Sequence, residues 1–117
     1  MRTKAELRAT RERVGLTQAK LAEAVGVQVR SVKRWESPEA PQNAPADVWG
    51  YLGDLLQAQD EAVDAAVARA KPEELYQLRH YANQEECPDG YWRVANATAR
   101  AIAITLEAQG FGVEWID

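Results

Sequence analysis

The pattern that sets the architecture of this chain is LTQAKLAEAVGVQVRSVKRWE, residues 16–36. Four apolar residues fall at spacings that turn inward when two short helices cross: Leu21, Val25, Val32 and Trp35. Gly26 can take the left-handed backbone conformation that ends one helix and starts a turn. The stretch therefore predicts two short helices joined by a tight turn, with the second helix beginning at about Gln28.

The second predicted helix carries Arg30, Lys33 and Arg34 on the face that its apolar residues do not use. Two short helices, a tight turn and a basic face form the layout of a helix-turn-helix, whose second helix lies in the DNA major groove. Thr17 can cap the first helix of the pair. Gln18 stands at the first helical position, where a side-chain amide can reach a phosphate. The motif predicts double-stranded DNA as the partner.

Charge is distributed unevenly along the chain. The net charge of −4 over 117 residues taken alone argues against nucleic acid. Residues 1–36, however, hold nine Lys and Arg against four Glu, a net of +5, whereas residues 37–117 hold five basic and fourteen acidic residues, a net of −9. The basic end coincides with the motif, which favours one face for a polyanion and an acidic body elsewhere.

The flanks of the motif extend the N-terminal domain to residues 1–70. Thr3-x-x-Glu6 is a capping box that opens a first helix, which Gly15 ends. Residues 37–45 contain three prolines and form a loop. A long helix is expected over 46–70, although Gly50 and Gly53 weaken the pattern near its start.

Residues 71–117 form a predicted C-terminal dimerisation element. Residues 73–81 fit a short strand or one helical turn, a turn follows at Cys87-Pro88-Asp89-Gly90, and a strand is expected at about 111–116. A helix at about 92–109 keeps its polar residues to one stripe, namely Arg93, Asn96, Arg100 and Glu107. A helix this apolar needs cover on two sides, and a second subunit is the natural supplier of one. Candidate dimerisation residues are Trp92, Ala95, Ala99, Ile102, Leu106 and Trp115.

A resemblance to the Xre/Cro-type helix-turn-helix family rests on Thr17-Gln18, Leu21-Ala22, Gly26-Val27 and Val32-x-x-Trp35-Glu36. It implies a lambda-repressor-like fold over roughly residues 3–70. The expected fold class is mainly α: a helix-turn-helix bundle with a C-terminal helical dimerisation element and one or two short β-strands. Gln28 departs from the family, which often begins the recognition helix with Ser or Thr.

A looser resemblance links the chain to short dimeric prokaryotic and phage regulators that include anti-CRISPR-associated autorepressors. It rests on Arg30-Ser31, Trp35-Glu36-Ser37, Pro45-Ala46-Asp47-Val48, Pro88-Asp89-Gly90 and Trp92-Arg93. It implies a homodimer, joined through the C-terminal part, that represses its own operon at an inverted repeat. Some members of that group act on RNA. The loop at 37–45 is longer here than is usual in the group.

Such a dimer would place two recognition helices about one DNA turn apart, roughly 34 Å, on a palindrome. Candidates for contacts to base edges are Gln28, Val29, Arg30 and Arg34. Candidates for contacts to the DNA backbone are Thr17, Gln18, Ser31 and Lys33. Val32 and Trp35 are expected in the core, and Glu36 is expected to pair with a basic side chain.

Several function classes find no support in the sequence. The only histidine is His80 and the only serines are Ser31 and Ser37, so no nucleophile–base pair can be assembled, and neither a metal-ligand cluster nor a phosphate-binding glycine loop is present. We therefore expect no enzyme, metal or cofactor.

The single Cys87 excludes an internal disulfide. No apolar leader or membrane span is predicted, which favours the cytoplasm.

One alternative function comes from the acidic C-terminal half. An antitoxin-like module would use the motif for autoregulation and the acidic half to bind a protein partner. RNA is a third partner class, without independent support from a basic and aromatic surface. Copurification of a second protein would distinguish the antitoxin-like function from that of a DNA-binding regulator alone.

Overall fold

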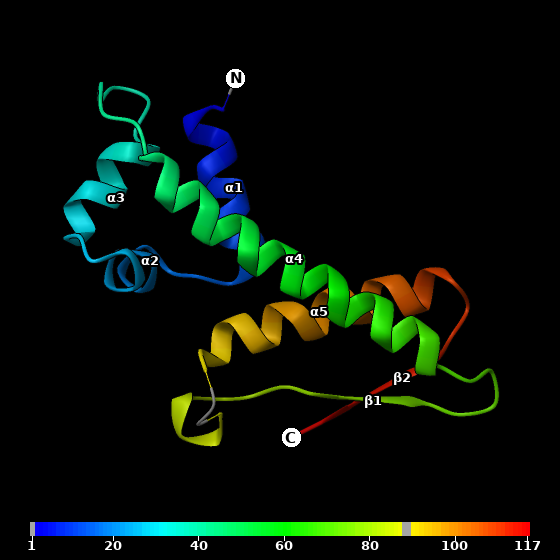
Figure 1. Cartoon of the computed structure of the whole chain (residues 1–117). Coiled ribbons are helices and arrows are strands. Elements are labelled where there is room, and N and C mark those ends of the chain that lie inside the picture. The colour runs from blue at the N-terminus through cyan, green and yellow to red at the C-terminus, as the bar shows by residue number, and fades with distance from the viewer. Residues whose placement is uncertain (1, 88–89) are drawn as a thin grey trace. The chain divides into compact units, whose positions relative to one another are not determined.

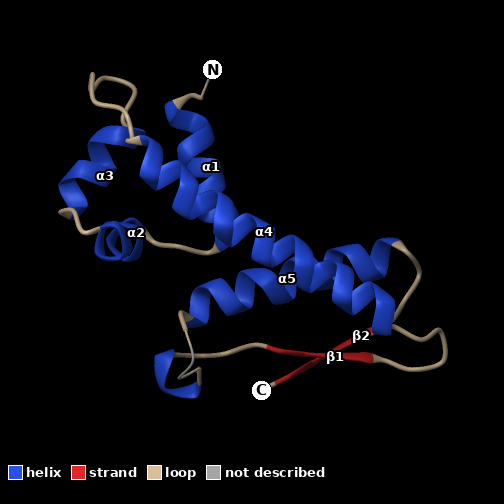
Figure 2. Cartoon of the chain, in the orientation of Figure 1, coloured by secondary structure: helices blue, strands red, loops and turns tan. Residues whose placement is uncertain are grey.

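The computed structural model describes residues 2–87 and 90–117, so half of the turn expected at 87–90 lies outside the described residues. The fold is mainly α with two short strands, which confirms the expected fold class (Figure 2). The elements in Figure 1 are α1 (Lys4–Val14), α2 (Gln18–Val25), α3 (Val29–Glu36), α4 (Ala46–Arg69), β1 (Tyr76–Arg79), the 3-10 helix Gln84–Glu86, α5 (Trp92–Ala108) and β2 (Val113–Ile116). None of the described helices is long and apolar enough to cross a membrane.

The chain divides into two compact units, an N-terminal unit of residues 1–56 and a C-terminal unit of residues 57–117. The division falls within α4, whereas the sequence suggested a boundary at residue 70, where this helix ends. The reason is that the second half of α4 contributes Ala66 to the core of the C-terminal unit. α4 is thus an element of both units.

Local signals shape the N-terminal unit as the sequence predicts. The Thr3 hydroxyl accepts a hydrogen bond from the Glu6 N–H at 3.0 Å, and Gly15 ends α1 with a φ of 89°. Thr17 caps α2 through the Lys20 N–H at 3.1 Å, and Gly26 ends it with a φ of 74°. The buried apolar residues of this unit are Leu7, Val14, Leu16, Leu21, Ala22, Val32, Trp35, Val48 and Leu52.

Two exposed glycines lie inside α4, which runs unbroken through both Gly50 and Gly53. A Cβ atom built at either position would meet no other atom within 4 Å. Because glycine costs a helix interior roughly 0.5–1 kcal/mol relative to alanine, we expect Gly50→Ala and Gly53→Ala each to raise the free energy of unfolding by about that amount. Urea denaturation measures the change. A loss of stability in either variant would contradict the open surroundings of these glycines.

The C-terminal unit packs α5 against a parallel strand pair. β1 pairs with β2 in the register Tyr76↔Val113 to Arg79↔Ile116, which settles the ambiguous segment 73–81 as a strand. The buried core of the unit consists of Ala66, Leu78, Ala99, Ile102, Ala103 and Leu106. The apolar face of α5 therefore covers one face of the two strands.

The expected polar stripe on α5 is wrong at one position. Asn96 is only 3% exposed. Its Oδ1 accepts a hydrogen bond from the Tyr81 N–H at 2.8 Å, and its Nδ2 donates to the Tyr81 carbonyl at 2.9 Å. The Asn96 amide thus takes the place of a neighbouring strand beside the chain that continues from β1.

Candidate nucleic-acid interface

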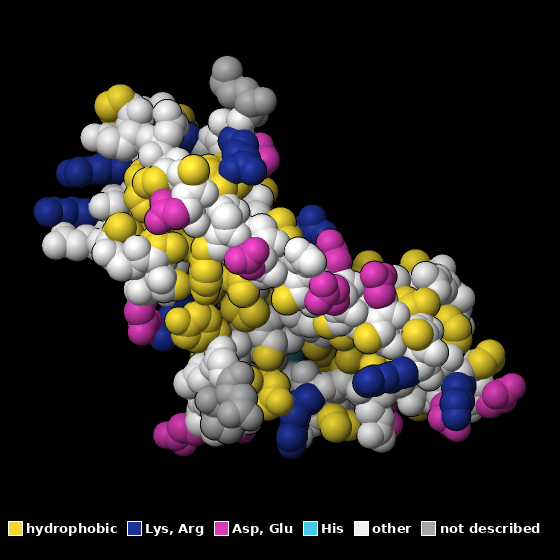
Figure 3. Space-filling model, viewed as in Figure 1, with side chains coloured by type: hydrophobic (Ala, Val, Ile, Leu, Met, Phe, Trp, Pro, Cys, Tyr) yellow, Lys and Arg dark blue, Asp and Glu magenta, His cyan; other side chains and the backbone are white. Residues whose placement is uncertain are grey.

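The two faces of α3 have opposite characters. Val32 and Trp35 are buried, as predicted. The residues Gln28, Val29, Arg30, Lys33 and Arg34, by contrast, are all exposed. In Figure 3, Lys and Arg side chains project from the surface over α3, at the left of the view. The structure thus gathers the four base-edge candidates and Lys33 on one accessible surface, which we call the α3 surface.

No interaction within residues 2–87 and 90–117 uses the polar side chains of the α3 surface. Gln28 is the N-cap of α3, but its side chain makes no capping hydrogen bond. In the described part of the chain, Arg30, Lys33 and Arg34 have no carboxylate within salt-bridge distance. Guanidinium and amide groups that are exposed and without an internal partner keep their donors for an external ligand.

Two of the remaining candidates for DNA-backbone contacts, Thr17 and Gln18, make hydrogen bonds within the motif. Thr17 accepts a hydrogen bond through its capping oxygen, which leaves its hydroxyl hydrogen able to donate. Gln18 Nε2 donates to Glu36 Oε1 at 3.1 Å, so its amide is oriented by the end of α3. Ser31 is half-buried on the first turn of α3.

A buried ion pair joins α1 to α3. Arg11 Nε lies 2.6 Å from Glu36 Oε2 and Arg11 Nη2 lies 2.9 Å from Glu36 Oε1, while Arg11 Nη1 donates to the Leu16 carbonyl at 2.9 Å. The two side chains are 9% and 4% exposed. The expected basic partner of Glu36 is therefore confirmed as Arg11. The sequence offered a signal for it, because Arg11 occupies the apolar stripe of α1 between Leu7 and Val14.

Lys4 was not predicted as a contributor to the site, yet it holds the C-terminal end of α3. Its Nζ donates to the carbonyls of Arg34 at 3.1 Å and Trp35 at 3.3 Å, and also to the carbonyl of Gln42. Three carbonyls use the three donors of an ammonium group. A cation at a helix C-terminus also interacts favourably with the helix dipole. Lys4 therefore ties the end of α3 and the loop 37–45 to α1.

An exposed ion pair on α1 differs from this buried network. Arg8 Nε donates to Glu12 Oε1 at 2.8 Å, and both side chains are more than half exposed. This hydrogen bond lowers the pKa of the Glu12 carboxyl below its ordinary value. Exposed pairs contribute little to stability. The geometry of the motif is therefore fixed by Arg11 and Glu36 rather than by Arg8 and Glu12.

Three of the six dimerisation candidates are used inside the chain itself. Ala99, Ile102 and Leu106 are buried in the core of the C-terminal unit, so the expectation that they meet a second subunit is corrected. Trp92 and Ala95 are half-buried, and Trp115 is 43% exposed. Within residues 2–87 and 90–117, no group of three or more His, Cys, Asp and Glu side chains could hold a metal ion.

One comparison with known proteins agrees with this geometry. A family model described as a helix-turn-helix domain matches residues 5–66, which span α1 to α3 and most of α4. A search among curated proteins found no match.

Proposed function

This chain belongs to the helix-turn-helix family, and we propose that it is a sequence-specific transcriptional regulator of the Xre/Cro type, a homodimeric autorepressor in the cytoplasm. The observation that carries the proposal is the α3 surface. Val32 and Trp35 face the core, while Gln28, Arg30 and Arg34 are exposed and have no side-chain partner among the described residues. A helix with this division can enter the major groove with its outward side chains against the base edges.

Each outward side chain suits one kind of base contact. The guanidinium groups of Arg30 and Arg34 can each donate two hydrogen bonds to a guanine. The amide of Gln28 can pair with an adenine, and Val29 can contact a thymine methyl. Each good polar pair discriminates between bases by about 1–3 kcal/mol. The α3 surface thus supplies enough contacts to read a short half-site.

Backbone contacts set the register of α3 on the duplex. Phosphates, which carry no sequence information themselves, are the proposed ligands of four side chains: Lys33, Ser31, Thr17 and Gln18. Glu36 does not read bases in this proposal, because both of its carboxylate oxygens are bound to Arg11. Two copies of the site, roughly 34 Å apart, would read the two halves of an inverted repeat.

The roles of Arg30 and Lys33 separate in a binding experiment. We expect Arg30→Ala to cost about 1–3 kcal/mol on the operator and to relax specificity at one base pair, because a base contact is lost. We expect Lys33→Ala to weaken all sequences alike and to lower the salt slope by about 1. Fluorescence anisotropy on duplexes tiling the upstream region of the gene, at several salt concentrations, measures both.

The controls are the wild-type chain and random duplexes of equal length. Equal losses for both variants on operator and random DNA would contradict the assignment of Arg30 to base contacts. Uniformly weak binding of the wild-type chain to every duplex would contradict operator recognition as a whole.

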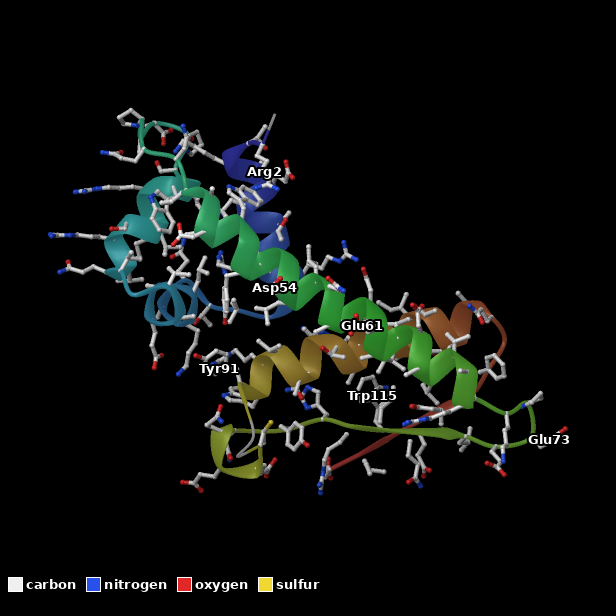
Figure 4. All side chains as sticks on the ribbon, in the orientation of Figure 1. Arg2, Asp54, Glu61, Glu73, Tyr91 and Trp115 are labelled. Carbon is white, nitrogen blue, oxygen red and sulfur yellow. The ribbon has the colours of Figure 1, made fainter. Side chains whose placement is uncertain are left out.

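The acidic half of the chain supports one second candidate, an antitoxin-like module. Residues 37–117 carry a net charge of −9, and Figure 4 labels Asp54 and Glu61 among the acidic side chains of α4. A basic protein partner that copurifies with the chain would favour this candidate. Tight binding to one palindrome by the isolated chain would favour the autorepressor.

A further inference from the structure

The strand β2 has one edge that no other strand covers. The Tyr76 N–H donates to the Gly112 carbonyl at 2.9 Å, and the His80 N–H donates to the Ile116 carbonyl at 3.1 Å. Alternate residues of a strand direct their backbone groups to opposite sides, so Gly112, Glu114 and Ile116 face β1. The N–H and C=O groups of Val113 and Trp115 therefore face away from β1, and the sheet has no further strand among the described residues.

The other edge of the pair runs along β1, and α5 closes the end that follows this strand. On the outer side of β1 the backbone groups of Gln77 and Arg79 face away from β2, by the same alternation. The next outward residue, Tyr81, already has both backbone groups bonded to the Asn96 side chain. In the part of the chain that the structure describes, no side chain bonds the outward backbone groups of Val113 and Trp115 on the edge of β2. A two-stranded pair is at best marginally stable alone, so this edge is the natural place for a further strand.

We propose that two copies of this chain pair their β2 strands antiparallel, about a two-fold axis at Trp115, to form one four-stranded sheet. The proposal deepens the homodimer of the proposed function and rests on it. A two-fold axis brings the same edge of both copies together, so the donors and acceptors of Val113 and Trp115 meet their own complements.

The side chains of β2 also favour a second copy as the occupant. Leu78 pairs with Trp115 across the strand pair, and Leu78 is buried against α5. Trp115, labelled in Figure 4, is 43% exposed. Antiparallel pairing at Trp115 would set two tryptophans side by side, flanked by the two Leu78 side chains. The apolar side chains of Leu78 and Trp115 in one copy would then lie next to those of the second copy across the two-fold axis.

Charge selects this register among the alternatives that the backbone directions allow. Centring the axis on Trp115 places Glu114 opposite Ile116 of the second copy and Val113 opposite Asp117. Centring it on Glu114 would place two glutamates directly opposite each other, which is destabilising. Centring it on Ile116 would leave Val113 unpaired. Centring it on Val113 would set Trp115 opposite Phe111, whose N–H already donates to the Leu106 carbonyl at 2.9 Å. The Trp115 register is therefore the one that uses both outward residues without opposing like charges.

Two proline variants test which edge is used. Val113→Pro removes an outward N–H and leaves the bonds to β1 intact, because the Gly112 carbonyl is kept. Gln77→Pro makes the same change on the outer edge of β1. With sedimentation velocity over a concentration series, we expect Val113→Pro to raise the dimer dissociation constant at least about tenfold and Gln77→Pro to leave it unchanged.

The outcomes are decisive once circular dichroism shows that both variants keep the wild-type helix content. A dimer weakened by Gln77→Pro alone, or by neither variant, overturns the proposal. A wild-type chain that is monomeric at concentrations where it binds its operator also overturns it. In that last case DNA recognition by α3 stands, so the two failures are distinguishable.

Cysteine cross-linking tests the register in a Cys87→Ala background. Directly opposite residues of an antiparallel pair lie at Cα separations that a disulfide can span. We expect Glu114→Cys mixed with Ile116→Cys to give a mixed disulfide dimer on mild oxidation, and neither variant alone to cross-link. Cross-linking of Glu114→Cys alone, or of Ile116→Cys alone, would assign a different register and overturn the Trp115 axis.

Discussion

Replacing Glu36 with alanine is expected to lower the free energy of unfolding by about 3–5 kcal/mol. The variant would leave the Arg11 guanidinium, whose side chain is 9% exposed, without its carboxylate. It would also release Gln18 Nε2 from its acceptor. A buried charge without a partner keeps its full desolvation cost, which is why the loss of one partner is far more damaging than the loss of both. Urea denaturation measures the effect.

Two controls separate the buried ion pair from a general effect of charge. Glu12→Ala removes the carboxylate of the exposed pair with Arg8, and its cost should be at most about 1 kcal/mol. The double variant Arg11→Met with Glu36→Leu should recover much of the lost stability, because it leaves no buried charge. A Glu36→Ala variant no less stable than Glu12→Ala would show that the pair does not hold α3 to α1.

Local signals explain why so much of the N-terminal unit could be predicted. The caps at Thr3 and Thr17 and the helix ends at Gly15 and Gly26 each depend on residues within one turn. The exposure of Arg30 and Arg34 follows from the same local rule, because Val32 and Trp35 fix which face of a helix turns inward. The sequence alone was therefore enough to predict which side chains of α3 are exposed and available for base contacts.

Contacts between distant residues set the limit of that prediction. Arg11 and Glu36 are separated by 25 positions and Lys4 and Gln42 by 38, so no short pattern links them. Residues 73–81 were ambiguous because the strand there forms only by pairing with β2, beyond α5. A periodic pattern predicts the orientation of a side chain in its helix, but not which element covers it.

The dimerisation candidates on α5 illustrate the same limit. Periodicity marked Ala99, Ile102 and Leu106 as apolar, and the structure uses them against β1 and α4 in the same chain. Nothing in the spacing distinguishes a core residue from an interface residue, since both are apolar on the same helix. Trp115 differs from them because it lies on a strand edge, and only the register of β1 and β2 shows which edge is free.

Asn96 should be the most sensitive polar residue of the C-terminal unit. We expect Asn96→Leu to cost about 2–4 kcal/mol in the free energy of unfolding, because it leaves both the N–H and the carbonyl of Tyr81 without their partner. Asn96→Asp should cost at least as much, because it buries a carboxylate without a cation and sets one of its oxygens against the Tyr81 carbonyl. Urea denaturation of both variants measures the difference.

The matched control is Arg100→Ala, a residue of the same predicted stripe that is exposed. Its effect should stay within about 0.5 kcal/mol, as for most surface substitutions. If Asn96→Leu were as mild as Arg100→Ala, water would be satisfying the backbone of Tyr81 and Asn96 would not close the edge of β1. The end of that edge at Tyr81 would then be open to a further strand. The stability of Asn96→Leu therefore tests the closed edge of β1 independently of any measurement on the dimer.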